Sequence, residues 1–104
     1  MQKYIIIGKN SQQTAASMLN KPQNRKELNK PLFEAFNVKV IEFLYFNHPE
    51  FDTLVTIEAE SDEIVSAACN LVYASGSFNF FNWFRAFKAD EWKDIYQTAS
   101  NNMA

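Results

Sequence analysis

Residues 38–59 read VKVIEFLYFNHPEFDTLVTIEA, and this stretch decides the fold. Its two halves, Val38 to Asn47 and Phe51 to Ala59, are rich in the β-branched and aromatic residues that favour extended strands. Only His48-Pro49-Glu50 lies between them, and so short a connection is typical of a hairpin. The stretch therefore predicts two antiparallel strands that are neighbours in one sheet.

The residues before this hairpin predict one strand and two helical pieces. Lys3 to Gly8 (KYIIIG) is β-branched and aromatic, whereas Ser11 to Asn37 carries apolar residues at helical spacing. Pro22 lacks the amide hydrogen that a helix interior needs, so we expect a break near Lys21 to Asn24. Pro31 is placed to kink or restart the second helical piece.

The residues after the hairpin predict a helix, a strand and a short final helix. Asp62 can cap the first of these, which we expect to end at Gly76, and Phe78 to Phe87 (FNFFNWFRAF) follows as a strand. From Asp90 onwards an amphipathic helix is indicated, because apolar residues recur at i, i+3, i+4 and i+7. These residues are Trp92, Ile95, Tyr96 and Ala99.

The element order is therefore strand, helix, strand, strand, helix, strand, followed by a short C-terminal helix. This order predicts a single α+β domain over residues 1–104, ferredoxin-like (βαββαβ), with a four-stranded antiparallel sheet and the helices on one face. The other face of such a sheet is left open.

Composition excludes several classes of function. A net charge of -2 without long runs of either sign argues against nucleic-acid and anionic-membrane partners. One histidine and one cysteine give no metal-ligand spacing, and the nucleotide-binding and hydrolase motifs are absent, so we predict neither a metal nor a cofactor. With no secretory signal and a single cysteine, the cytoplasm is the expected location.

Both faces of the sheet are predicted to be largely apolar. If Phe46 pairs with Phe51, then Val40, Glu42 and Val55 share the helix-side face. An uncovered apolar face favours a homodimer formed sheet against sheet. The predicted interface residues are Ile41, Phe43, Tyr45, Leu54, Phe81 and Trp83. The alternative is that the C-terminal helix folds back over this face within one chain.

Two residues are candidate catalytic bases. Glu42 on the helix-side face would have its pKa raised by burial, but a strand-edge glutamate in contact with water is the competing interpretation. His48, beside Glu50 and Asp52, suggests a histidine–carboxylate dyad, with a polar turn as the alternative. Cys69 lies mid-helix without a cationic neighbour and is interpreted as a small buried hydrophobe.

Six parts of the chain together carry a family resemblance: Lys3 to Ile6, Arg25, Glu42 to Phe46, Pro49 to Asp52, Ser75-Gly76 and Arg85 to Phe87. Through them the sequence resembles the GYD domain family over nearly its whole length. The Gly-Tyr-Asp signature falls on Pro49 to Asp52, where Asp52 is kept and Phe51 replaces the tyrosine, and Asn37-Val38 replaces a common glycine pair. The resemblance implies the dimeric α/β-barrel type of ferredoxin-like fold and assigns no activity.

Three functions are compatible with these observations. The first is a dimer that binds a small apolar or aromatic molecule in the cleft between sheet and helices, and whether it is an enzyme is open. The second is a cofactor-independent oxygenase or isomerase with Glu42 or His48 as base. The third, an RNA binder, lacks a basic surface. The predicted ligand-binding residues are Tyr4, Glu42, His48, Asp52 and Arg85.

Overall fold

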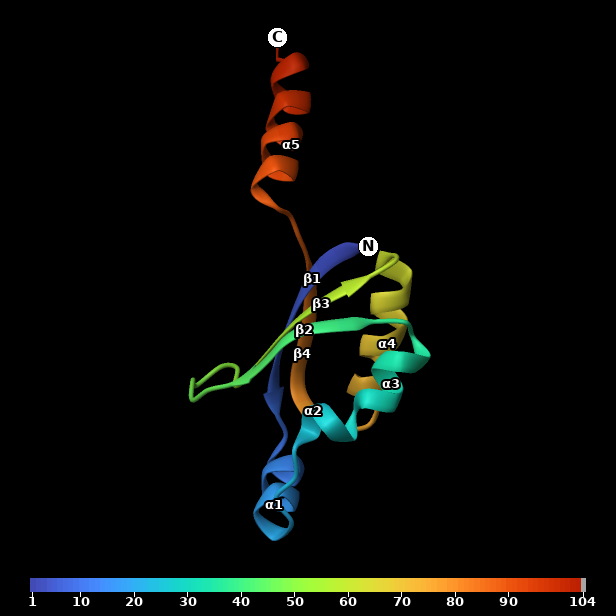
Figure 1. Cartoon of the computed structure of the whole chain (residues 1–104). Helices are drawn as coiled ribbons and strands as arrows, with labels where there is room; N and C mark the ends of the chain where they lie inside the picture. The colour runs from blue at the N-terminus through green and yellow to red at the C-terminus, as the bar shows by residue number, and fades with distance from the viewer. Residues whose placement is uncertain (104) are drawn as a thin grey trace.

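The computed structural model describes residues 1–103, and its centre is one antiparallel sheet. The strands are β1 (Gln2–Asn10), β2 (Lys39–Tyr45), β3 (Thr53–Ala59) and β4 (Phe78–Ala86). They lie in the order β2-β3-β1-β4, so the first strand is central and the hairpin β2-β3 forms one side (Figure 1). The predicted α+β, ferredoxin-like fold and the hairpin at His48 are both confirmed.

Two groups of helices differ in their relation to the sheet. The helices are α1 (Gln12–Asn20), α2 (Arg25–Leu28), α3 (Lys30–Ala35), α4 (Asp62–Ala74) and α5 (Ala89–Asn101). Figure 1 shows α3 and α4 beside the sheet, whereas α1 and α5 project from opposite ends of it. The molecule is correspondingly long, with extents of 59 × 31 × 21 Å. Because α5 extends beyond the sheet, it does not fold back over the open face of its own chain.

The helix boundaries follow the expected local chemistry with two differences. The break at Lys21 to Asn24 is confirmed, but a further break at Asn29, just before Pro31, gives three helical pieces instead of two. Helix α4 is capped by Ser61, whose Oγ accepts a hydrogen bond from the Ile64 amide at 3.3 Å. Asp62, the predicted cap, is instead the first helical residue. A serine oxygen at this place satisfies an amide that has no partner within the helix.

A β-bulge in β2 reverses the predicted assignment of its side chains. Val40 lies opposite Ile57, but Glu42 lies opposite Thr56, so Ile41 is the extra residue. A bulge changes which face the following residues occupy, because side chains alternate along a strand. Glu42 is therefore on the open face, and Phe43, predicted to be open, faces the helices.

The predicted interface is wrong for most of its residues, because of this bulge and because the two faces of β4 are the reverse of those expected. Phe81 and Trp83 lie opposite Gly8 and Ile6, on the face where Ile6 is buried. Together with Phe43 they pack against the buried core, and Tyr45 lies opposite the buried Thr53. Of the six predicted residues, Leu54 does lie on the open face, because its side chain points away from the buried side of β3. Ile41 is the extra residue of the bulge.

The core lies between the sheet and α4. Its buried hydrophobic residues come from β1, β3 and α4: Tyr4, Ile6, Val55, Ile57, Ala59, Val65 and Cys69. The opposite side of the sheet, the open face, is also apolar, as expected. The apolar residues of the open face are Ile5, Ile7, Leu44, Leu54, Phe80 and Phe84, with Glu42, Thr56 and Asn82 among them and the charged Lys3, Lys9, Lys39 and Glu58 toward its ends. The side chains of Leu44 and Phe84 are 46% and 51% exposed in the single chain.

Candidate functional site

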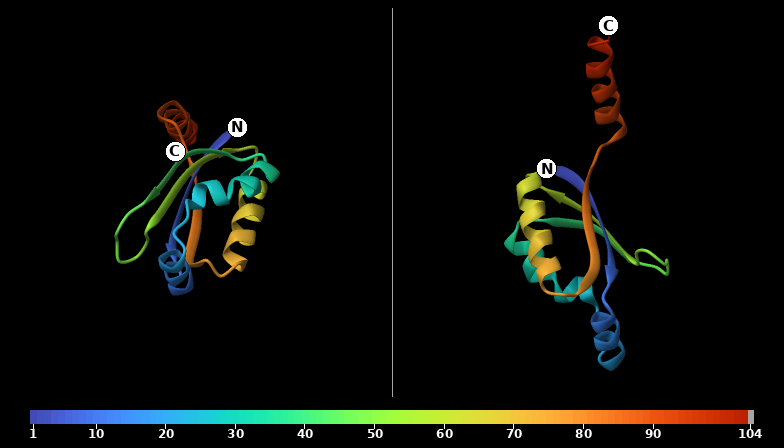
Figure 2. Two further views of the ribbon diagram at one scale, coloured as in Figure 1. Left: turned by 60° about the horizontal axis from the view of Figure 1, so that its bottom comes forward. Right: turned by 180° about the vertical axis from the view of Figure 1, so that it is seen from behind.

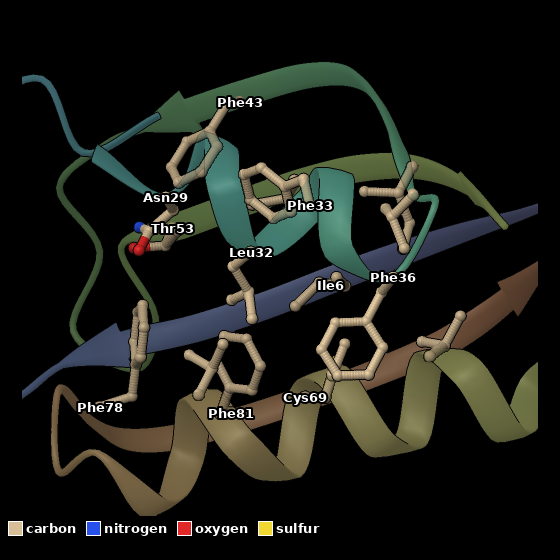
Figure 3. A pocket seen from close by; sticks show the side chains of 16 residues that line it. Ile6, Asn29, Leu32, Phe33, Phe36, Phe43, Thr53, Cys69, Phe78 and Phe81 are labelled. Atoms are coloured by element: carbon tan, nitrogen blue, oxygen red, sulfur yellow. The ribbon is translucent and has the colours of Figure 1, made fainter. Parts of the chain in front are cut away.

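A cleft opens between the helix-side face of the sheet and helices α3 and α4. Sixteen residues from six elements and their connections line it, and its volume is about 50 Å³ (Figure 3). Aromatic rings dominate the lining, since α3 and the turn after it contribute Phe33 and Phe36, while the strands contribute Phe43, Phe78 and Phe81. The cleft is where the sequence-based hypothesis placed a binding site.

Helical periodicity explains how α4 forms one wall of the cleft. Val65, Ala68, Cys69 and Val72 are spaced at i, i+3, i+4 and i+7, so all four lie on the face turned toward the cleft. Val65 is fully buried, and Cys69 is nearly so. This wall is therefore held in place by the core.

The opposite wall, which the α2–α3 segment forms through Asn29, α3 and the turn after it, is less firmly held. Neither short helix contains a buried residue. The segment ends at Asn37, whose φ of 52° is in the left-handed region that asparagine tolerates better than most residues. The Val38 amide donates to the Phe33 carbonyl at 2.8 Å and closes the turn. This wall is therefore less constrained by the core than the wall formed by α4.

The cleft is electrically neutral. Its sixteen lining residues include no acidic, basic or histidine side chain, and polar side-chain atoms come from Asn29, Thr53 and the Cys69 thiol. The Thr53 hydroxyl is already engaged, because it donates to Asp52 and accepts from Asn10. In Figure 3 the Asn29 and Thr53 side chains lie together at one end of the cleft. One end of the cleft is thus polar, and the rest of its lining is apolar.

Cys69 is expected to be unreactive in the folded protein. Burial raises the pKa of its thiol from 9.0 to about 12, so the thiolate that reacts with alkylating reagents is depleted about a thousandfold. Labelling by iodoacetamide at pH 8 should be slow in buffer and fast in urea. Rapid labelling without denaturant would show that α4 opens readily, and a Cys69→Ala variant supplies the unlabelled control.

The five predicted ligand-binding residues do not line this cleft. Tyr4 lies in the core, where its hydroxyl is 2.5 Å from Asp62 Oδ1 and 2.6 Å from Gln2 Oε1. Burial and the Asp62 carboxylate raise the pKa of Tyr4 to about 12, so this hydroxyl remains protonated and acts as a donor. The Tyr4 ring also packs edge-on against Trp83, at 5.8 Å between ring centroids. Its role is structural.

The two candidate bases lie away from the cleft and from each other. Glu42 is exposed on the open face because of the bulge at Ile41, so the interpretation as a solvated strand residue fits. His48 is exposed in the hairpin, where its ring stacks on Phe51 at 4.4 Å and its Nδ1 accepts from the Glu50 amide at 3.1 Å. These contacts are those of a polar turn.

Asp52 fixes the hairpin to β1. Its Oδ1 accepts hydrogen bonds from the backbone amide and the side-chain amide of Asn10, both at 3.0 Å, and its Oδ2 is 3.8 Å from Lys9 Nζ. The Asp52 amide donates to the Gly8 carbonyl at 2.9 Å. The aspartate of the signature therefore has a structural explanation in the joining of the hairpin to the central strand.

Arg85 connects the sheet to the C-terminal helix. Its Nη2 is 3.3 Å from Glu91 Oε2, and its guanidinium lies 4.8 Å from the centre of the Phe87 ring. These contacts support structural pairing within the chain at this position.

The aromatic residues that form the cleft walls were not predicted from the sequence. Leu32, Phe33 and Phe36 have the helical spacing of a packed face, which indicates burial but not a cavity. No motif marks a cleft made of apolar side chains. The misplacement of Phe43 and Phe81 follows from the bulge in β2 and the reversed faces of β4.

Comparison with known proteins decides the family. A family model described as GYD domain matches residues 4–96. The chain belongs to the GYD domain family. The match begins in β1 and ends in α5, so the resemblance seen in the sequence is confirmed over nearly the whole domain. Neither the curated proteins nor the solved structures include a match to this GYD domain.

Two further findings on this GYD domain concern metal ligands and membrane-spanning helices. Within residues 1–103, no three histidine, cysteine, aspartate or glutamate side chains gather in a way that could hold a metal ion. None of the helices in the same range is both long and apolar enough to cross a membrane.

Proposed function

We propose that this GYD domain binds a small, neutral, apolar molecule in the cleft between the sheet, α3 and α4. The observation that carries the proposal is the lining, which combines five phenylalanine rings with aliphatic side chains and contains no charged group. Ligand sites are typically concave and largely apolar, with few polar groups that orient the ligand. Asn29 at the polar end supplies such a group, which favours an aromatic molecule carrying one hydrogen-bonding substituent.

The ligand has to widen the cleft in order to enter. A volume of about 50 Å³ is smaller than the roughly 150 Å³ of an apolar cavity known to admit benzene. The α2–α3 wall contains no buried residue, so displacing it exposes little additional core. We therefore infer that this wall moves outward while α4 and the sheet stay fixed.

Filling the cleft is expected to abolish binding. Ala68→Leu adds three carbons to a side chain that lines the cleft, whereas the matched Ala67→Leu adds them to an exposed position on the same helix. With indole as the probe, amide chemical-shift changes should map to α3 and α4 in the wild type and in Ala67→Leu. In Ala68→Leu the apparent affinity should fall at least tenfold.

The control for this experiment is the fold of each variant, checked by thermal unfolding. Shifts that map to the β2–β3 hairpin, or equal indole affinity in both variants, would contradict the proposed site. Neither Glu42 nor His48 lines the cleft, so we do not propose the base-catalysed alternative.

We also propose that two copies of the domain pair through their open faces. The apolar residues of this face come from all four strands, and Phe84 alone is 51% exposed in the single chain. Water-soluble monomers rarely expose apolar patches larger than a few hundred Å². A two-fold arrangement covers both patches at once, because each copy presents the same surface.

A further inference from the structure

Helix α5 carries an apolar stripe that its own chain leaves uncovered. Apolar residues recur along one side of the helix, and the polar residues Asp90, Lys93 and Asp94 lie elsewhere around it. The stripe consists of Trp92, Ile95, Tyr96 and Ala99. The side chains of Trp92 and Tyr96 are 51% and 64% exposed.

The direction of α5 is fixed at its base. The Lys88 amide donates to Glu91 Oε1 at 2.9 Å, and the same carboxylate lies 3.3 Å from Arg85 Nη2 on β4. Phe87 packs against Trp92 at 5.8 Å between centroids. Only Phe87 and Lys88 separate β4 from α5, so folding the helix back over its own sheet would require these contacts to break.

A projecting helix of this length needs another surface to pack against in order to be stable in water. An isolated helix shorter than about 12–15 residues is marginal in water, and α5 has 13. In the left view of Figure 2, α5 lies across the sheet from α3 and α4, on the side of the open face. That is the side on which a second copy would sit.

The area of the open face also favours a second copy of the chain as the partner of α5. Four strands about 4.8 Å apart and about 23 Å long give a face of roughly 450 Å² per copy. A standard stable interface buries about 800 Å² per partner, so the sheets alone fall short. From Trp92 to Ala99 the stripe is about 10 Å long and about 10 Å wide, so one arm contributed and one received add about 200 Å² per copy, more than half of the difference.

We propose that α5 is an arm that packs its apolar stripe against the second copy of the chain, at the margin of the paired open faces. This inference rests on the proposed dimer. The stripe is continuous with the open face, because β4 carries Phe80 and Phe84 and runs directly into Phe87 and Trp92. Two-fold symmetry makes the exchange of arms reciprocal.

The test compares the dimer dissociation constant of three chains by sedimentation equilibrium. These are the full chain, the full-length double variant Trp92→Glu/Tyr96→Glu, and Lys93→Ala on the polar side of α5. The double variant should dimerise at least tenfold more weakly than the full chain, whereas Lys93→Ala should match it. Equal dissociation constants for all of them would overturn the arm and leave the dimer intact; a monomeric full chain would overturn both.

A second measurement distinguishes packing on the partner from packing within one chain. In dimers mixed from isotope-labelled and unlabelled chains, the Ile95 methyl groups should give nuclear Overhauser effects to protons of the other chain. Effects confined to the same chain, or a stripe that remains exposed to solvent in the dimer, would overturn the proposal.

Discussion

Replacing Phe84 by glutamate is expected to convert the dimer into a folded monomer. Phe84 is on the open face, and the proposed two-fold arrangement would bring it against the same surface of the partner. Phe84→Glu would bury a carboxylate without a partner in each copy, and removing a charge from water costs several kcal/mol. The dimer dissociation constant should rise at least a hundredfold, measured by sedimentation or light scattering.

Two control variants separate loss of pairing from loss of folding. Leu19→Glu adds the same charge to α1, where the leucine is 86% exposed and far from the open face, and it should leave the dimer unchanged. Phe43→Glu places the charge in the cleft and should destabilise the fold itself. If Phe84→Glu still dimerises like the wild type, the open face is not the interface.

Replacing Tyr4 by alanine should cause a large loss of stability. Tyr4 is fully buried between β3, β4 and α4, so truncation removes an aromatic ring and leaves a cavity. Comparable aromatic truncations cost about 3–5 kcal/mol, a large part of the stability of a domain of this size. Urea unfolding at one fixed protein concentration measures the loss.

Tyr4→Phe isolates the contribution of the hydroxyl. It keeps the ring and removes the hydrogen bonds to Asp62 and Gln2, which should cost about 1 kcal/mol. The raised pKa means that the folded state favours the protonated hydroxyl, so this contribution is present below about pH 10 and is lost as the pH rises toward about 12. Tyr4→Phe should therefore lose less stability than the wild type over that range. An identical loss in both proteins would contradict this role.

The order of the elements was predictable because local signals agree with the fold. The residues of β2 and β3 are strongly β-forming, and Gly76, with φ of 78°, follows α4 where a left-handed residue is favoured. The faces of β2 were not predictable in the same way. Ile41 is apolar and β-branched like Val40, and nothing in its identity shows that it has no partner opposite it in β3.

The candidate site was predictable in position but not in composition. The fold indicated a cleft between sheet and helices, whereas none of the polar residues chosen for it lines the cleft. Tyr4 meets Asp62 across 58 positions of sequence, and Asp52 meets Asn10 across 42. Contacts between residues so distant in the chain depend on the register of the strands, which a single sequence does not provide.

The bulge at Ile41 also bears on how large an assembly can grow. β2 is at the edge of the sheet, where an unbroken row of free backbone groups would accept a strand from another molecule. The extra residue interrupts the regular spacing of those groups and twists the strand locally. Addition of a strand at the β2 edge is thereby hindered, and in the proposed dimer, association through faces would give a closed pair instead of a fibre.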